Sequence, residues 1–88
     1  MQKTIIIIQN KLGLHARASA KFVTTAGRHT CHIEVKSKGK TVNGKSIMGV
    51  MMLAASKGTE LEIIAEGEDE IVAIEALTLL IDEKFGEE

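Results

Sequence analysis

The chain has 88 residues and a formal net charge of −1, which is the size of one small domain. Its only aromatic residues are Phe22 and Phe85, so binding of nucleic acid by base stacking on aromatic rings is not expected. Its single cysteine, Cys31, excludes an internal disulfide, and no apolar run is long enough for a signal peptide or a membrane span. We therefore expect a cytoplasmic protein that does not insert into a membrane.

Charge is divided unevenly along the chain. Residues 1–57 carry ten Lys or Arg residues against one acid, whereas residues 58–88 carry eleven acids against one base. Such an asymmetry can steer an acidic partner to one face of a protein. A solvated surface with an acidic final helix is the simpler alternative.

The first elements are predicted from β-branched residues and then from helical spacing. The run Ile5–Ile8 predicts a strand within residues 4–9 that is buried on at least one face. A turn at 11–13 separates it from a helix predicted over residues 16–26. The apolar face of this helix is formed by Ala16, Ser19, Ala20, Phe22, Val23 and Ala26.

Strands and helices continue to alternate through the rest of the chain. Alternating polarity predicts strands at 31–36, 41–43 and 60–66, and Ser46 is expected to cap a short helix that begins at Ile47. A last helix is predicted from the apolar stripe Ile71, Ile74, Leu77, Ile81 and Phe85. The order β-α-β-β-α-β-α predicts an α+β sandwich with an antiparallel sheet and helices on one face.

The segment Gly13–Arg17 has the sequence Gly-Leu-His-Ala-Arg and places His15 at the start of the first predicted helix. Unpaired N–H groups, here those of Ala16 and Arg17, and the helix dipole favour an anion at such a position. Neutral imidazole is a nucleophile near neutral pH, so His15 is a candidate to carry a phosphoryl group with help from the Arg17 side chain. A polar N-cap without chemistry is the alternative.

The second predicted helix is too apolar to bury only one side. Val50, Leu53 and Ala54 occupy one arc of its helical wheel. A second arc, which we call the apolar arc, consists of Ile47, Met48, Met51 and Met52. We expect the apolar arc to be partly exposed and to suit docking of a partner, unless its methionines pack beneath a neighbouring loop.

His29, Cys31 and His32 lie close enough in sequence to suggest a metal site. Strand alternation would send Cys31 inward and His32 outward, so the three side chains should not converge. We expect no metal and no cofactor.

Two of these motifs together resemble the HPr family, the histidine-containing phosphocarriers of the bacterial phosphoenolpyruvate-dependent phosphotransferase system. They are Gly13–Arg17 and, about thirty residues later, the segment Lys45–Met51 with the sequence Lys-Ser-Ile-Met-Gly-Val-Met. The resemblance extends over essentially the whole chain. It implies a single HPr domain over residues 1–88, an open-faced sandwich whose four-stranded antiparallel sheet is covered on one face by three helices.

The resemblance implies a carrier rather than an independent enzyme. His15 would accept a phosphoryl group from phosphorylated Enzyme I on Nδ1 and pass it to an IIA protein or domain, while Arg17 assists the phosphate. The positions Ile47, Met48 and Met51 would contact these partners, and the carrier would act as a monomer. No nucleic-acid partner is expected.

Ser46 matches the serine that HPr kinase/phosphorylase phosphorylates in many bacteria. A phosphate there would add roughly two negative charges beside the apolar arc, which should weaken binding to Enzyme I. The alternative is a plain N-cap, which stabilises a helix by ~1 kcal/mol.

Two positions depart from the family pattern. Ala18 stands where the family usually has proline, and Leu12 stands where sugar-type HPr often has a polar residue. The segment 10–13 is closer to the carrier of the nitrogen-linked branch, NPr, whereas the Ser46 region is closer to the kinase-regulated HPr proteins. The branch and the transported sugar stay open. Two other classes of function also stay open: a regulatory module that is switched by Ser46 alone, and a small ligand-binding α+β domain.

Overall fold

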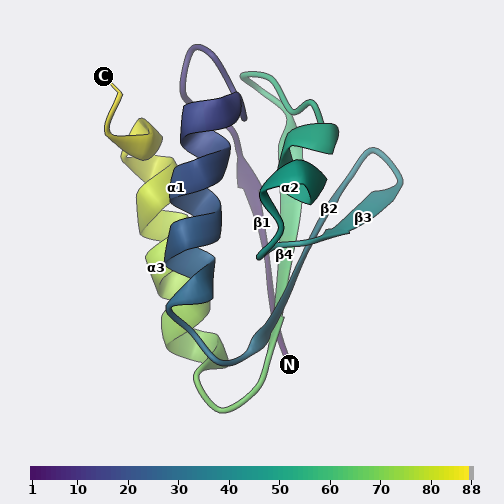
Figure 1. The fold of residues 1–88 in the computed structure, drawn as a ribbon, viewed down its shortest axis with the longest axis vertical. Helices are drawn as coiled ribbons and strands as arrows, with labels where there is room; N and C mark the ends of the chain where they lie inside the picture. The colour runs from purple at the N-terminus through teal and green to yellow at the C-terminus, as the bar shows by residue number, and fades with distance from the viewer. Residues whose placement is uncertain (88) are drawn as a thin grey trace.

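The structure, a computed structural model, describes residues 1–87. Within them lie four strands, three α-helices and one short 3-10 turn. In chain order they are β1 (Gln2–Ile7), α1 (Ala16–Gly27), β2 (His32–Ser37), β3 (Lys40–Asn43), α2 (Ile47–Met52), β4 (Glu60–Glu66), α3 (Glu70–Asp82) and η1 (Lys84–Gly86). The strands form one antiparallel sheet in the order β1-β4-β2-β3. The predicted fold class is confirmed (Figure 1).

One face of the sheet carries the core because side chains alternate along each strand. Ile6 of β1, Val35 of β2 and Ile63 of β4 are buried, and Val35 pairs with Ile63 across the two central strands. Ile5 and Ile7 point to the other face and are exposed. The helices therefore cover one side of the sheet only.

The predicted apolar faces of two helices are confirmed except at their first turns. In α1 the predicted Ser19, Phe22 and Ala26 are buried, but Ala16 is exposed and Ala18 is buried in its place. In α3 the predicted Leu77 and Ile81 are buried, but Ile71 is exposed and Ala73 is buried. The reason is helical phase, because Ala18 and Ala73 lie four residues before Phe22 and Leu77 and so share their buried side.

Helices α1 and α3 pack against each other and run in opposite directions (Figure 1). The end of α3 and the last described residues consequently lie beside the start of α1. Phe85 lies beyond α3, in η1, and is buried as predicted. None of the helices in the described part of the chain combines the length and apolar character that crossing a bilayer requires.

Candidate functional site

The loop before His15 is pressed against the segment that follows α2. Gly13 has a φ of +67°, and a Cβ atom there would lie 2.4 Å from the carbonyl oxygen of Ala55. The next amide, that of Leu14, donates to the same oxygen at 2.8 Å, and the Leu14 side chain is buried. Only glycine fits this position, because it alone tolerates both the positive φ and the close approach. The backbone that carries His15 is fixed as a result.

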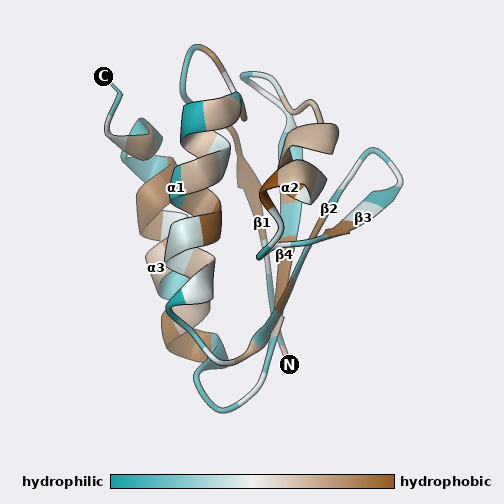
Figure 2. Cartoon of the chain, viewed as in Figure 1, coloured by the Kyte–Doolittle hydropathy of each residue, from teal (hydrophilic) through white to brown (hydrophobic). Residues whose placement is uncertain are grey.

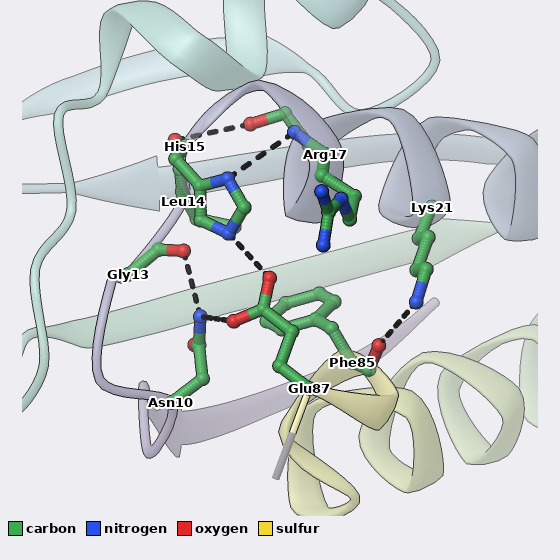
Figure 3. A network of polar contacts seen from close by, with 9 residues as sticks. Asn10, Gly13, Leu14, His15, Arg17, Lys21, Phe85 and Glu87 are labelled. Atoms are coloured by element: carbon green, nitrogen blue, oxygen red, sulfur yellow. Dashed lines mark hydrogen bonds and ion pairs between the residues drawn. The ribbon is translucent and has the colours of Figure 1, made fainter.

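His15 is the N-cap of α1, as the sequence predicts. Its backbone is extended, and its Nδ1 accepts a hydrogen bond from the amide of Arg17 at 3.3 Å. The other ring nitrogen, Nε2, contacts the carboxylate Oε2 of Glu87 (Figure 3). The side chain is 28% exposed. The imidazole is thus held at both nitrogens while part of it still faces solvent.

Glu87 reaches the ring from the far end of the chain and is held by a second contact. Its Oε1 accepts from Nδ2 of Asn10 at 3.0 Å, and the same amide donates to the carbonyl of Gly13 at 2.8 Å. Partial desolvation raises the pKa of Glu87, but hydrogen bonds from Asn10 and His15 and the nearby charge of Arg17 outweigh it, so the pKa lies below its ordinary value. The carboxylate is therefore ionised at neutral pH.

The N-terminus of α1 provides the predicted donors, with one difference. The first intrahelical hydrogen bond runs from the amide of Ser19 to the carbonyl of His15 at 2.8 Å, so the amides of Ala16 and Arg17 lie ahead of the helical hydrogen bonds. That of Arg17 already donates to His15 Nδ1. The Arg17 side chain is exposed and extends toward the chain end that carries Glu87 (Figure 3). Phosphate binding by these groups stays a prediction.

Ser46 is the N-cap of α2, again as predicted. Its backbone is extended, and its Oγ accepts from the amide of Gly49 at 3.1 Å. The residue is partly exposed. Its hydroxyl is thus used as a cap and also lies near the protein surface.

The apolar arc of α2 is exposed, as expected for a docking surface. Met48 and Met52 are 72% and 68% exposed, and Ile47 and Met51 are also exposed. Val50 and Leu53 face the core, but Ala54 is exposed, unlike the prediction, since the chain turns there with a φ of +51°. The methionines are not packed beneath a loop, and Figure 2 shows α2 as an apolar segment beside α1.

The segment around Cys31 is held by the carboxylate of Asp69. Cys31 is buried and His32 is exposed, as the alternation predicts, and the described residues contain no group of three or more His, Cys, Asp or Glu that could hold a metal ion. Asp69 accepts from the amides of Thr30 and Cys31 at 2.9 Å each. Burial, followed by Asp69, raises the pKa of the Cys31 thiol, so this thiol is a poor nucleophile.

Sequence reasoning identified the residues at the two helix starts and missed those that come to them from elsewhere. Asn10 and Glu87 are 77 residues apart, and no local pattern links them to each other or to His15. The only available signal was indirect. Phe85 was predicted to be buried, and Gly86 directly after it could turn the chain back over α1.

Comparison with known proteins places the chain in a family. The family model described as "PTS HPr component phosphorylation site" matches residues 2–83. The chain belongs to the HPr family. A phosphocarrier protein HPr of Pseudomonas aeruginosa is 57% identical over 83 residues, which cover 93% of this chain and 92% of that protein. Membership of the HPr family implies phosphotransfer within the phosphotransferase system.

Solved HPr structures share the fold closely. The crystal structure of HPr-C-His from Thermoanaerobacter tengcongensis has a TM-score of 0.97 and 51% identity, and covers 100% of this chain and 99% of that one. A second structure, described as an HPr dimer from the same organism, has a TM-score of 0.80 and 50% identity and covers 99% of this chain and all of that one. Because HPr is also found as a dimer, the expected monomer stays a prediction.

Proposed function

We propose that this chain takes a phosphoryl group from phosphorylated Enzyme I onto Nδ1 of His15 and passes it to an IIA protein or domain. The observation that carries the proposal is the partly exposed His15 ring at the N-terminus of α1, with Nδ1 directed at a backbone amide. An amide can only donate, so Nδ1 must present a lone pair. That lone pair is what a nucleophile needs.

The transfer needs positioning and charge stabilisation more than covalent machinery. The Nδ1 lone pair forms the new bond to phosphorus while the bond between phosphorus and the donor histidine nitrogen breaks, and the electron pair returns to that nitrogen. The amides of Ala16 and Arg17 and the Arg17 guanidinium would hold the phosphate oxygens. For this the Arg17 amide must change its acceptor from His15 Nδ1 to the phosphate.

Partner recognition is assigned to the apolar arc, with Ile47, Met48 and Met51 in contact with Enzyme I and IIA in turn. Their exposure beside α1 supports this assignment, because methionine side chains adapt to more than one surface. Both partners would then meet the chain on the side where His15 lies. The proposed place of action is the cytoplasm, and the proposed state is the monomer.

Ser46 is proposed as a regulatory site for HPr kinase/phosphorylase. Its Oγ lies at a helix N-terminus, where a phosphate is favourably placed, and the apolar arc begins at the next residue. A phosphate there would keep the cap and add charge to the docking surface. Phosphorylation of Ser46 would therefore lower the rate at which His15 is phosphorylated.

The test is to incubate the chain with labelled phosphoenolpyruvate and Enzyme I and to look for acid-labile phosphate. We expect label in the wild type and in His32→Ala, an exposed histidine on β2 that serves as the matched control, and none in His15→Ala. Label that persists in His15→Ala would contradict the proposal. An unlabelled wild type that is nevertheless phosphorylated on Ser46 would favour a purely regulatory module.

A further inference from the structure

We propose that Glu87 is a positioning residue for His15, holding the proton on Nε2 so that Nδ1 stays the bare nitrogen at the start of α1. The inference deepens the proposed function, because it concerns the same histidine. It assigns a role in phosphoryl transfer to a carboxylate 72 residues away in sequence.

The two partners of the ring are compatible with one neutral tautomer. The Arg17 amide donates to Nδ1, so this nitrogen carries no proton. The ionised carboxylate of Glu87 can only accept, so the proton must lie on Nε2. The opposite tautomer would set an N–H against an N–H on one side of the ring and a lone pair against a carboxylate on the other. Glu87 therefore selects the tautomer that the proposed transfer requires.

Glu87 is itself held in place by the chain end that carries it. The Phe85 side chain is buried in the core, and Nζ of Lys21 donates to the Phe85 carbonyl at 2.6 Å (Figure 3). Lys84, Phe85 and Gly86 all have positive φ, with values of 56°, 55° and 73°. Non-glycine residues adopt this conformation only when the surroundings impose it. The burial of Phe85 imposes it here and directs the chain back toward α1.

Charged groups around the ring agree with this role. Helix α1 contributes Arg17 and Lys21, the preceding loop contributes Lys11, and α2 has no ionisable side chain. Glu87 is the acid in contact with the ring among the described residues. Its charge thus acts on the imidazole from the Nε2 side, whereas the helix amide of Arg17 lies on the Nδ1 side, where phosphate would bind.

The carboxylate would also act during transfer. When Nδ1 bonds to phosphorus, the ring keeps its proton on Nε2 and becomes positively charged. Glu87 neutralises part of this charge across the existing hydrogen bond, and no proton needs to leave. When the phosphoryl group is passed on, the electron pair of the breaking bond returns to Nδ1 and the same neutral tautomer is restored. The ring is therefore ready for the next cycle without rearrangement.

The experiment compares Glu87→Ala and Glu87→Gln with Glu83→Gln, which removes the same charge from an exposed residue just ahead of η1. Long-range ¹H–¹⁵N spectra of the unphosphorylated protein report the ring proton and its exchange with solvent. In wild type and Glu83→Gln we expect a protected proton on Nε2, and in Glu87→Ala rapid exchange of that proton. Glu87→Gln should lie between them, because its amide oxygen accepts without a charge.

Phosphorylation by Enzyme I supplies the second readout. We expect kcat with Glu87→Ala as acceptor to fall about tenfold while KM stays within about twofold, because one charge-assisted contact is lost and the apolar arc is intact. Glu83→Gln should match the wild type. Equal kcat for Glu87→Ala and Glu83→Gln would overturn the inference whatever the spectra show. If no variant, the wild type included, accepts phosphate, the proposed function fails, and an unchanged ring proton in Glu87→Ala would then overturn the positioning role independently.

Discussion

His15 and Ser46 occupy the same structural position in two different helices. Each is an N-cap with extended backbone, and the side chain of each accepts a hydrogen bond from an amide of the first turn, Arg17 in α1 and Gly49 in α2. Both caps satisfy donors that the helix itself leaves unpaired. Position at the helix start therefore does not distinguish the two residues.

The surroundings distinguish them. His15 lies among groups from three parts of the chain, with Glu87 at its second nitrogen and Asn10 holding that carboxylate. Ser46 precedes a helix of six residues whose exposed side is apolar and uncharged. A phosphate on the histidine would meet charged and polar groups, whereas a phosphate on the serine would add charge beside the exposed apolar arc. The capping hydrogen bond fixes where each side chain lies, and the neighbouring groups determine what a phosphate would meet there.

The largest effect is expected when the last described residues are released from α1. Phe85→Ala removes a buried ring, so we expect the free energy of unfolding to fall by about 3–5 kcal/mol and the contact between Glu87 and His15 to be lost, with the Ser46 cap unaffected. Urea unfolding measures the first effect. Ile71→Ala, at an exposed position of α3, is the control and should change stability by less than about 0.5 kcal/mol. Similar values for the two variants would show that Phe85 does not anchor the chain end.

A charge at the second cap tests its proposed role. Ser46→Asp retains an acceptor for the Gly49 amide but places a carboxylate directly before the apolar arc, so we expect kcat/KM for phosphorylation by Enzyme I to fall on the order of tenfold. Thr41→Asp adds the same charge at an exposed position of β3 and should leave the rate within about twofold. Equal rates in the two variants would contradict the proposed contact between the apolar arc and Enzyme I.

Removal of the Ser46 cap without an added charge should lower the stability of the protein and leave phosphorylation of His15 unchanged. Ser46→Ala leaves the Gly49 amide without its side-chain acceptor, so we expect stability to fall by ~1 kcal/mol while phosphorylation of His15 stays near the wild-type rate. Thermal melting and the Enzyme I assay measure the two quantities. A large loss of transfer in Ser46→Ala would mean that the hydroxyl acts on phosphate transfer directly.

The start of the third helix, α3, differs from the other two, and substitution there is expected to have the smallest effect on stability. Asp69 is the N-cap of α3, but its side chain makes no hydrogen bond to its own helix and accepts instead from Thr30 and Cys31. Partial desolvation raises the pKa of Asp69, but these hydrogen bonds outweigh it and lower the pKa from 3.8 to about 2. Since the unfolded chain then binds more protons, the stability that Asp69 contributes is complete above about pH 4 and disappears as the pH falls toward 2.

The free energy of unfolding of Asp69→Asn should therefore fall less steeply than that of the wild type as the pH is lowered from 4 to 2. Glu75→Gln, which removes an exposed carboxylate from α3, should keep the wild-type slope. A slope in Asp69→Asn equal to that of the wild type would show that these amides do not bind the ionised carboxylate in preference to the protonated one.

Sequence patterns predicted what depends on neighbours along the chain. A β-branched run predicted the first strand and alternation the other three, and the residues Gly13, His15 and Ser46 predicted the starts of α1 and α2. Periodicity also predicted burial of Phe85, but it extended the last helix through that residue. Helix α3 instead ends at Asp82, and the chain turns through η1 because the Phe85 ring must reach the core, a requirement that arises from tertiary packing.

The part of the site that the sequence did not predict is formed by residues far apart in the chain. The contact of Glu87 with His15 depends on the antiparallel packing of α1 and α3, on the buried ring of Phe85 and on the Lys21 hydrogen bond to its carbonyl. None of these has a signature in the residues near His15. Local chemistry therefore predicted the candidate nucleophile, and only the assembled fold showed which group contacts its second nitrogen.

Gly13 lies where the loop before α1 meets the segment that follows α2. The carbonyl of Ala55, just beyond α2, lies against the Gly13 Cα and accepts the hydrogen bond of the Leu14 amide. The backbone one residue before His15 is therefore tied to the end of α2 by main-chain atoms alone, with no side chain between them.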